Sequence, residues 1–149
     1  MTRRGRIGLI LLLAAGLQGW VGAAWSGMVV VVAHANVRKL DALTVQRIYT
    51  GRVVVLDGIP VSPVNLVPGH LLRQRFLAEY LMQDEQSYLA YWTVRRYVGK
   101  GVPPRELAST ADVIQYVLNT PGAVAYLDEA EVPPGMNIVL RARGAASSP

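Results

Sequence analysis

VNLVPGHLLRQRF, at residues 64–76, indicates most clearly which kind of fold this chain adopts. Its apolar start is typical of a strand, and the pair Pro68 and Gly69 breaks that strand. Beyond the break, Leu72 and Phe76 recur at the spacing of one helix face. A strand that turns directly into an amphipathic helix is the layout in which α/β proteins bind an anion on free backbone amides. The segment therefore predicts an α/β fold and raises the question of an anion site.

The segments on either side continue the alternation of strands and helices. Apolar runs predict further strands at residues 28–35, 53–56, 59–65, 123–127 and 136–141. Helices are predicted after three N-cap residues, Asp41, Asp84 and Ser109, and from about residue 70 to 82. No repeat and no linker interrupts this pattern. We therefore expect one α/β domain with a mixed sheet of about five strands flanked by helices.

Asp57 and Gly58 stand between two apolar runs, which is a strong signal for a β-hairpin. The returning strand contains Pro60 and Pro63, neither of which has a backbone N–H to donate to a neighbouring strand. We therefore expect this strand to lie at an edge of the sheet or to be irregular.

The beginning of the chain differs from the rest in composition. Three arginines precede an apolar run from Ile7 to about Leu17, and small residues follow up to Ala24. This order is typical of a secretory signal peptide, so we assign residues 1–24 to a cleavable signal peptide and place the protein in the periplasm. The alternative is that the apolar run stays on the protein as a membrane anchor.

Removal of that segment would leave a domain at residues 25–143 and a tail at 144–149, which we expect to be disordered. The three arginines of the signal segment leave 12 of the 15 basic residues against 10 acidic ones, a net charge of +2. Such a charge does not indicate a nucleic-acid partner. The chain has no cysteine, which excludes disulfides and thiolate chemistry and is compatible with a bacterial periplasm.

Residues that would carry catalysis or bind a metal form no recognisable pattern. There is no Gly-x-Ser-x-Gly turn for a nucleophilic serine and no phosphate-cradling glycine motif. The two histidines, His34 and His70, lack the paired spacing of a zinc site. The acidic DEAE, at residues 128–131, reads as solvated loop charge. We expect no catalytic residue, no metal site and no cofactor, and keep an envelope hydrolase only as a third hypothesis.

YLAYWTVRRYVGKG, at residues 88–101, mixes aromatic and basic residues in a way that single-stranded nucleic-acid sites also use. Helical spacing places Tyr88, Tyr91, Trp92 and Arg95 on one side, however, so we expect the aromatic rings to belong to the core. The stem of Arg95 would then lie along them. We therefore expect no nucleic acid as a partner.

Five segments, in chain order, carry a family resemblance: LDALTVQRIYTGR, LDGIPVSPVN, RQRFLAEYL, YWTVRRYVGKGVPP and TPGAVAYL. Their order and spacing resemble the periplasmic phosphate-binding proteins of ABC transporters, especially the short stand-alone members of that superfamily. The resemblance runs from about residue 29 to 140. It implies the fold of a type 2 periplasmic binding protein. Full-length members close two lobes on a solute, and this chain has the length of about one lobe.

The resemblance also implies where an oxyanion would bind. In related proteins this lobe contributes an arginine and a Gly-Ser-Gly-Thr turn at a helix N-terminus. Here Gly69 matches the first glycine and His70 replaces the serine. Leu71 and Leu72 replace the second glycine and the threonine, and Leu66 stands near the position of the arginine. Both hydroxyls and the arginine are therefore missing.

Arg73 matches a basic residue that follows the threonine in the family, where it usually faces outward. On this basis the candidate ligand-binding residues are Asn65, Gly69, His70 and Arg73. The helix dipole stabilises an anion at one exposed terminus by about 0.3–1 kcal/mol. Micromolar affinity requires about 8 kcal/mol. We therefore expect an isolated molecule to bind phosphate weakly.

Two functions follow as hypotheses. The first is a solute-binding-protein-like domain with a degraded oxyanion site, which works beside an ABC permease in transport. The second is an interaction or sensory-accessory protein of the envelope that binds a membrane sensor or another protein. The apolar residues Leu66, Val67, Leu71 and Leu72 favour the second, unless they belong to the core. A homodimer could supply the missing lobe in either case.

Overall fold

The computed structural model describes residues 27–142. The predicted signal peptide and the predicted disordered tail therefore lie outside the described residues. Within residues 27–142, no helix combines the length and the apolar character needed to cross a membrane.

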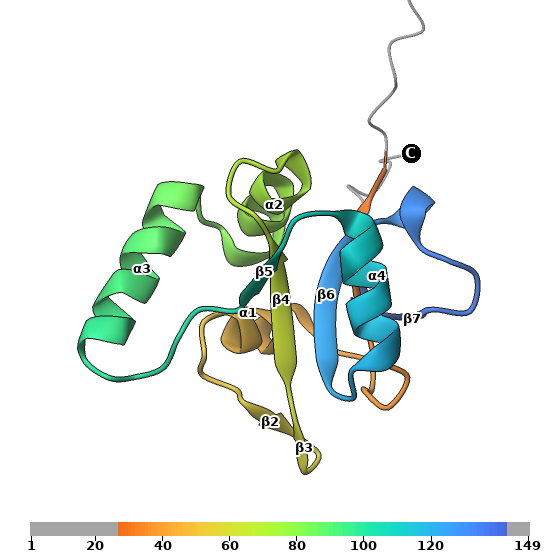
Figure 1. Ribbon diagram of the computed structural model, residues 1–149, viewed down its shortest axis with the longest axis horizontal. Coiled ribbons are helices and arrows are strands. Elements are labelled where there is room, and N and C mark those ends of the chain that lie inside the picture. The colour runs from red at the N-terminus through yellow and green to blue at the C-terminus, as the bar shows by residue number, and fades with distance from the viewer. Residues whose placement is uncertain (1–26, 143–149) are drawn as a thin grey trace, which may run out of the picture.

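Five strands form the main sheet. They are β1 (Val29–Ala33), β4 (Ser62–Leu66), β5 (Arg105–Leu107), β6 (Ala123–Asp128) and β7 (Asn137–Arg141). Their spatial order is β5-β4-β6-β1-β7 (Figure 1). β4 runs parallel to β5 and β6, whereas β1 runs antiparallel to β6 and β7. The sheet is mixed and five-stranded, which confirms the predicted fold class.

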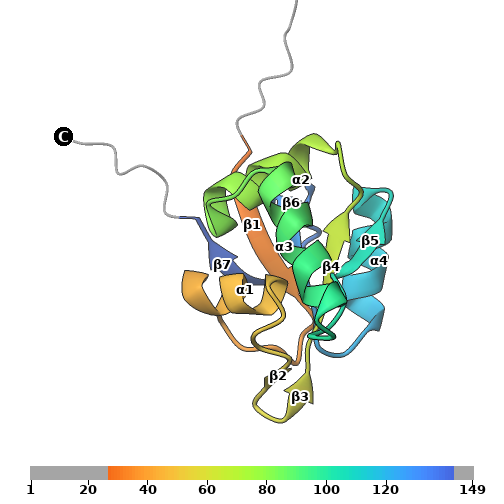
Figure 2. The same cartoon turned by 90° about the vertical axis from the view of Figure 1, so that its left-hand side faces the viewer.

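Helices cover both faces of this sheet. They are α1 (Ala42–Tyr49), α2 (Leu71–Phe76), α3 (Glu85–Tyr97) and α4 (Thr110–Asn119). α1 and α2 lie on one side and α4 lies on the other, while α3 stands beside β4 and β5 (Figure 2). All five residues of β1 are buried, because β1 has strands on both edges and helices over both faces.

The predicted N-caps are confirmed. The side chain of Asp41 accepts a hydrogen bond from the Thr44 amide, and that of Asp84 accepts one from the Ser87 amide. Ser109 does the same for the amide of Asp112. Each bond satisfies an amide that the first helical turn leaves free, which explains why the three helices begin at these places.

The helix expected at about residues 70–82 consists of two parts. After α2 the backbone widens into a π-helical turn, Leu77–Leu81 (η1), which ends where Met82 adopts a left-handed conformation with φ 55°. Five apolar residues of the two parts are buried in the core: Leu72, Phe76, Leu77, Tyr80 and Leu81. The predicted helix face is therefore correct, and the change of helix type was not foreseen.

The hairpin predicted around Asp57 and Gly58 joins β2 (Val55–Leu56) to β3 (Ile59–Pro60). Both turn residues have positive φ, as a type I′ turn requires. The returning segment is irregular, as expected, because it is interrupted between β3 and β4. It is not an edge, because β4 lies between β5 and β6. Pro63 lies opposite Val124 of β6 but precedes Val64, the first residue that pairs with β5, so its missing N–H costs no bond to β5.

Candidate functional site

Asn65, near the carboxyl end of β4, is held by buried tyrosines. Its Nδ2 donates to the hydroxyl of Tyr88 at 3.2 Å, and its Oδ1 accepts from the hydroxyl of Tyr126 at 3.2 Å. The Tyr88 hydroxyl donates in turn to the carbonyl of Tyr49, and the Tyr126 hydroxyl accepts from the amide of Leu66. Asn65 itself is 1% exposed. Both ends of its amide are therefore used to join β4 to α3 and β6.

The tyrosines of this region are strongly desolvated. Burial raises the pKa of Tyr49 well above its ordinary value, and burial likewise raises the pKa of Tyr88 and of Tyr126. The ring of Tyr126 stacks on Phe76 with centroids 4.0 Å apart, and Tyr49 packs against Phe76 at 4.7 Å. These phenols are neutral at physiological pH and act as hydrogen-bonding core residues.

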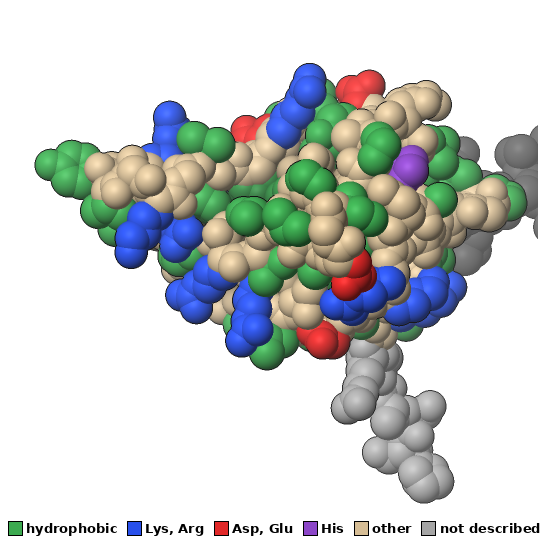
Figure 3. Space-filling view, turned by 90° about the horizontal axis from the view of Figure 1, so that it is seen from below, with side chains coloured by type: hydrophobic (Ala, Val, Ile, Leu, Met, Phe, Trp, Pro, Cys, Tyr) green, Lys and Arg blue, Asp and Glu red, His purple; other side chains and the backbone are tan. Residues whose placement is uncertain are grey.

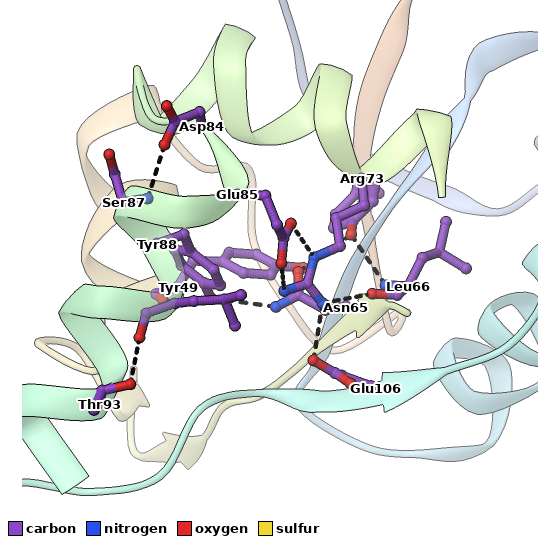
Figure 4. A network of polar contacts seen from close by, with 12 residues as sticks. Tyr49, Asn65, Leu66, Arg73, Asp84, Glu85, Ser87, Tyr88, Thr93 and Glu106 are labelled. Carbon is purple, nitrogen blue, oxygen red and sulfur yellow. Dashed lines mark hydrogen bonds and ion pairs between the residues drawn. The ribbon is translucent and has the colours of Figure 1, made fainter. Parts of the chain in front are cut away.

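Arg73 lies beside this cluster and is 1% exposed (Figure 4). Its Nε and Nη2 donate to the two carboxylate oxygens of Glu85, at 2.9 and 2.6 Å. Its Nη1 donates to the carbonyl of Leu66 at 2.8 Å and to Glu106 at 2.9 Å. The guanidinium carbon also lies 5.7 Å from the centre of the Tyr88 ring. One side chain thus ties α2 to α3, β4 and β5.

The charge of Arg73 is more than balanced by its neighbours. Burial by itself lowers the pKa of the guanidinium, but the hydrogen bonds to Glu85 and Glu106 outweigh it, and the pKa of Arg73 is raised. The two carboxylates are partly solvated, at 25% and 41% exposure. Two negative charges surround one positive charge. Arg73 itself therefore offers no surplus positive charge with which to attract an anion.

The position of Arg73 corrects one expectation. The family resemblance implied that this residue faces outward, but its side chain is buried among α2, α3, β4 and β5. The physical reason is the presence of Glu85 and Glu106, which satisfy the guanidinium inside the protein. A buried arginine needs such partners.

Gly69 and His70 occupy the loop before α2. Gly69 has φ +90° and open space around it, so a left-handed backbone conformation requires the glycine there. His70 is the N-cap of α2, and its Nδ1 accepts a hydrogen bond from the Leu72 amide at 3.2 Å. The histidine thereby satisfies one of the amides that an anion would otherwise meet.

The structure brings together two of the four candidate residues. Asn65 and Arg73 both line a small pocket of about 80 Å³, whose other lining residues include Thr93, Arg96 and Glu106. Gly69 and His70 do not line it. The pocket that Asn65 and Arg73 share therefore does not extend to the loop of Gly69 and His70.

The sequence analysis did not identify Glu85, Glu106, Tyr88 or Tyr126 as parts of this region. Glu106 lies on β5, which follows Pro103 and Pro104 and is too short to give a strand pattern. Glu85 follows the N-cap Asp84, where an acidic residue usually serves the helix dipole. Only the register of β4 with β5, which sets Asn65 opposite Glu106, reveals their shared role.

The apolar residues at the loop divide into two groups. Leu66 and Leu72 are buried and belong to the core, whereas Leu71 and Val67 are partly exposed, at 45% and 36%. The four residues therefore do not form one apolar surface. Within residues 27–142, no group of His, Asp and Glu side chains is arranged to hold a metal ion.

Two solved structures share this fold. One is a phosphate ABC transporter substrate-binding protein from Clostridium perfringens with bound phosphate; it is 17% identical, with a TM-score of 0.61, over 76% of this chain and 44% of that chain. The other is an ABC-type phosphate transport receptor from Vibrio cholerae; it is 12% identical, with a TM-score of 0.60, over 76% of this chain and 45% of that chain. No protein-family model and no curated protein matches the chain.

The chain therefore has a phosphate-binding-protein-like fold, as its sequence segments predicted. It spans less than half the length of either structural neighbour. Both neighbours are named as phosphate transport proteins and not as enzymes, which is consistent with a non-enzymatic protein. Identities this low establish the fold alone.

Proposed function

We propose that this chain is a non-enzymatic binding-protein-like domain of the periplasm whose oxyanion site at residues 65–73 is degraded, and which acts by binding a protein partner. Its export would depend on the signal-like residues 1–24. Two observations support the proposal. The fold is phosphate-binding-protein-like, and the polar groups of the candidate site already bind one another.

One observation carries the proposal: the guanidinium of Arg73 makes four hydrogen bonds inside the protein, three of them to the carboxylates of Glu85 and Glu106. A phosphate would have to displace Glu85 or Glu106, and the displaced carboxylate would then repel the anion. Asn65 is occupied in the same way by Tyr88 and Tyr126. The donors that a phosphate needs are present, but they stabilise the fold.

The remaining donors supply too little affinity. The loop at Gly69 and His70 offers backbone amides and a helix dipole, which is worth about 0.3–1 kcal/mol. Phosphate binding at about millimolar concentration already requires about 4 kcal/mol. We therefore expect the isolated chain to bind phosphate with an affinity too low for solute capture in transport.

Titration calorimetry of the exported chain with phosphate and with sulfate tests this proposal. We expect no saturable heat at micromolar anion. Micromolar binding that disappears in R73K, which keeps the charge but cannot form the bidentate pair with Glu85, would contradict the proposal.

A second variant sharpens the test because it restores a free donor. E106Q removes one of the two charges that hold Arg73, and we expect it to raise the affinity for phosphate. E131Q is the matched control, because Glu131 is exposed and has no ion-pair partner within the described residues. If E106Q binds phosphate no better than E131Q, the ion pairs of Arg73 are not the reason that the chain binds phosphate weakly.

A further inference from the structure

Six of the seven basic side chains that lack an ion-pair partner within the described residues gather at one end of the molecule. Within residues 27–142 the seven are Lys39, Arg47, Arg52, Arg95, Arg96, Lys100 and Arg105. All except Lys39 lie where α1 and α3 end or on the segment that follows α3. We call these six residues, from Arg47 to Arg105, the basic end.

Contacts between α1 and α3 bring these residues together. The hydroxyl of Tyr91 donates to the carbonyl of Thr50 at 2.7 Å, and Arg95 donates to the carbonyls of Gly51 and Lys100. Gly51 is required there twice over: it has φ +69°, and a Cβ would lie 2.8 Å from the Trp92 ring. The ends of the two helices are thus held side by side.

Within residues 27–142, no acidic side chain forms an ion pair with the basic end. Between Glu85 and Glu106 the sequence has four basic residues and no acidic one, and both flanking carboxylates bind Arg73. The fields of the unpaired cations therefore add together. Figure 3 shows Lys and Arg side chains along the α3 half of the molecule, with hydrophobic side chains between them.

The same region exposes apolar side chains. Tyr97 is 92% exposed, Val102 is 72% exposed, and Val94 and Val98 are also exposed. Tyrosine and arginine are the residues that interface centres favour, and exposed apolar groups beside them are typical of binding surfaces. Exposed apolar side chains do not stabilise a helix end that only contacts water, so their presence here favours a binding surface.

A groove of about 260 Å³ runs beside this surface, between the hairpin segment and the segment after α3. Its walls are mainly apolar and include Val53, Val61, Trp92 and Pro103, and Arg105 is among its lining residues. The groove can receive one or two apolar side chains while the cations around it remain in solvent.

Helix dipoles explain only part of this charge. Arg95 and Arg96 lie in the last turn of α3, and Arg47 lies in the last turn of α1, where cations stabilise the helix. The dipole does not account for Arg52 or Arg105, which lie outside the helices, nor for the exposed apolar groups.

From this arrangement we infer that the basic end binds an acidic peptide segment of a partner protein, with an aliphatic or aromatic side chain in the groove and carboxylates against the surrounding cations. The inference rests on the proposed function, in which the domain acts through a partner. Complementary charge would steer the encounter, and the apolar contact would hold the complex.

Other occupants fit the surface less well. Residues 1–26 and 143–149 contain no Asp or Glu, so neither end of this chain carries the matching charge. A second copy that presented its own basic end would be repelled. A membrane surface is flat, whereas the groove is concave and takes individual side chains.

Selection of peptides from a random display library on the immobilised, exported chain tests the inference. We expect enrichment of sequences that combine Asp and Glu with one or two branched aliphatic or aromatic residues, and weaker binding at higher salt. Failure to enrich any peptide, or enrichment of sequences without acidic residues, would overturn it.

Charge-matched variants then locate the site. We expect R96E with K100E to weaken binding of an enriched peptide by about tenfold or more, whereas K39E with R141E, which changes the net charge equally on the β7 side, leaves it unchanged. Equal loss in both pairs would mean unspecific attraction and would overturn the inference. Y97S tests the apolar contribution without altering charge.

Two further measurements identify a wrong occupant. Tighter binding to phosphatidylglycerol vesicles than to any enriched peptide would replace the protein partner with a membrane. Sedimentation that shows a dimer abolished by R96E with K100E would replace it with a second copy. R73K and E106Q leave every residue of the basic end unchanged, so failure of the inference and failure of the proposed function remain distinguishable.

Discussion

Arg73 and Arg96 line the same small pocket, but they differ in burial and in ion pairing. Arg73 is 1% exposed and binds two carboxylates, whereas Arg96 is exposed and has no ion-pair partner within the described residues. The first arginine stabilises the fold and has no remaining charge to offer. The second contributes to a field that reaches solvent.

This difference shows that an arginine beside a candidate site does not by itself supply a cation for a ligand. What matters is whether the cation is free when the ligand arrives. In this domain the positive charge available to a ligand lies at the end of α3 and on the segment that follows it.

The largest expected change in stability comes from removing Arg73 from its ion pairs with Glu85 and Glu106. R73M should lower the free energy of unfolding by about 3–5 kcal/mol, because Glu85 and Glu106 are left beside each other without their cation. Urea unfolding followed by circular dichroism measures the change. R96M is the control on the outer arginine and should stay within about 0.5 kcal/mol of the parent. Similar losses of stability in R73M and R96M would contradict the contrast between a structural Arg73 and a free Arg96.

A smaller loss is expected when the amide at the centre of the tyrosine cluster is removed. N65A leaves the hydroxyls of Tyr88 and Tyr126 with one partner fewer, which costs about 1–3 kcal/mol. The same unfolding experiment measures it. Y126F, which removes one hydroxyl and its bond to the Leu66 amide, is the companion variant. An unchanged stability in N65A would mean that water replaces the amide.

Alkaline pH should lower the stability of the protein through its buried tyrosines. Burial raises the pKa of Tyr80 from 10.0 to about 12 and also raises the pKa of Tyr49, Tyr88 and Tyr126. The unfolded phenols lose their protons first, so stability is complete below about pH 10 and falls by about 1.4 kcal/mol per pH unit for each such tyrosine above it. Urea midpoints from pH 8 to 12 measure the slope, and Y80F should reduce it.

The smallest effect on stability is expected at the basic end. R96E with K100E should change the free energy of unfolding by no more than about 0.5 kcal/mol, since neither side chain is buried or paired. The thermal midpoint measures it. A large loss would show that these cations serve the fold and would weaken their assignment to a binding surface.

The sequence predicted the framework of the fold because its signals are local. The valines of β1, the caps at Asp41, Asp84 and Ser109 and the turn at Asp57 each depend on residues close in the chain. β5 escaped prediction because three residues after two prolines give no periodic pattern. The place of β4 inside the sheet also depends on pairing with distant strands.

The site was less predictable for the same reason. Asn65 and Arg73 could be selected from the segment itself, but their partners come from α3, β5 and β6. Whether an arginine is a free ligand donor or a buried structural group depends on those distant partners. The basic end likewise depends on the contact between α1 and α3, which no single segment reveals.

Nuclear magnetic resonance of the arginine Nε–H groups during a phosphate titration tests the central contrast most directly. The account predicts that the Arg73 signal is sharp, exchanges slowly with solvent and does not move at millimolar phosphate, because Glu85 holds that proton. The Arg96 signal should exchange rapidly. An Arg73 signal that shifts and saturates with micromolar phosphate would show that the guanidinium is a ligand donor and would contradict the account.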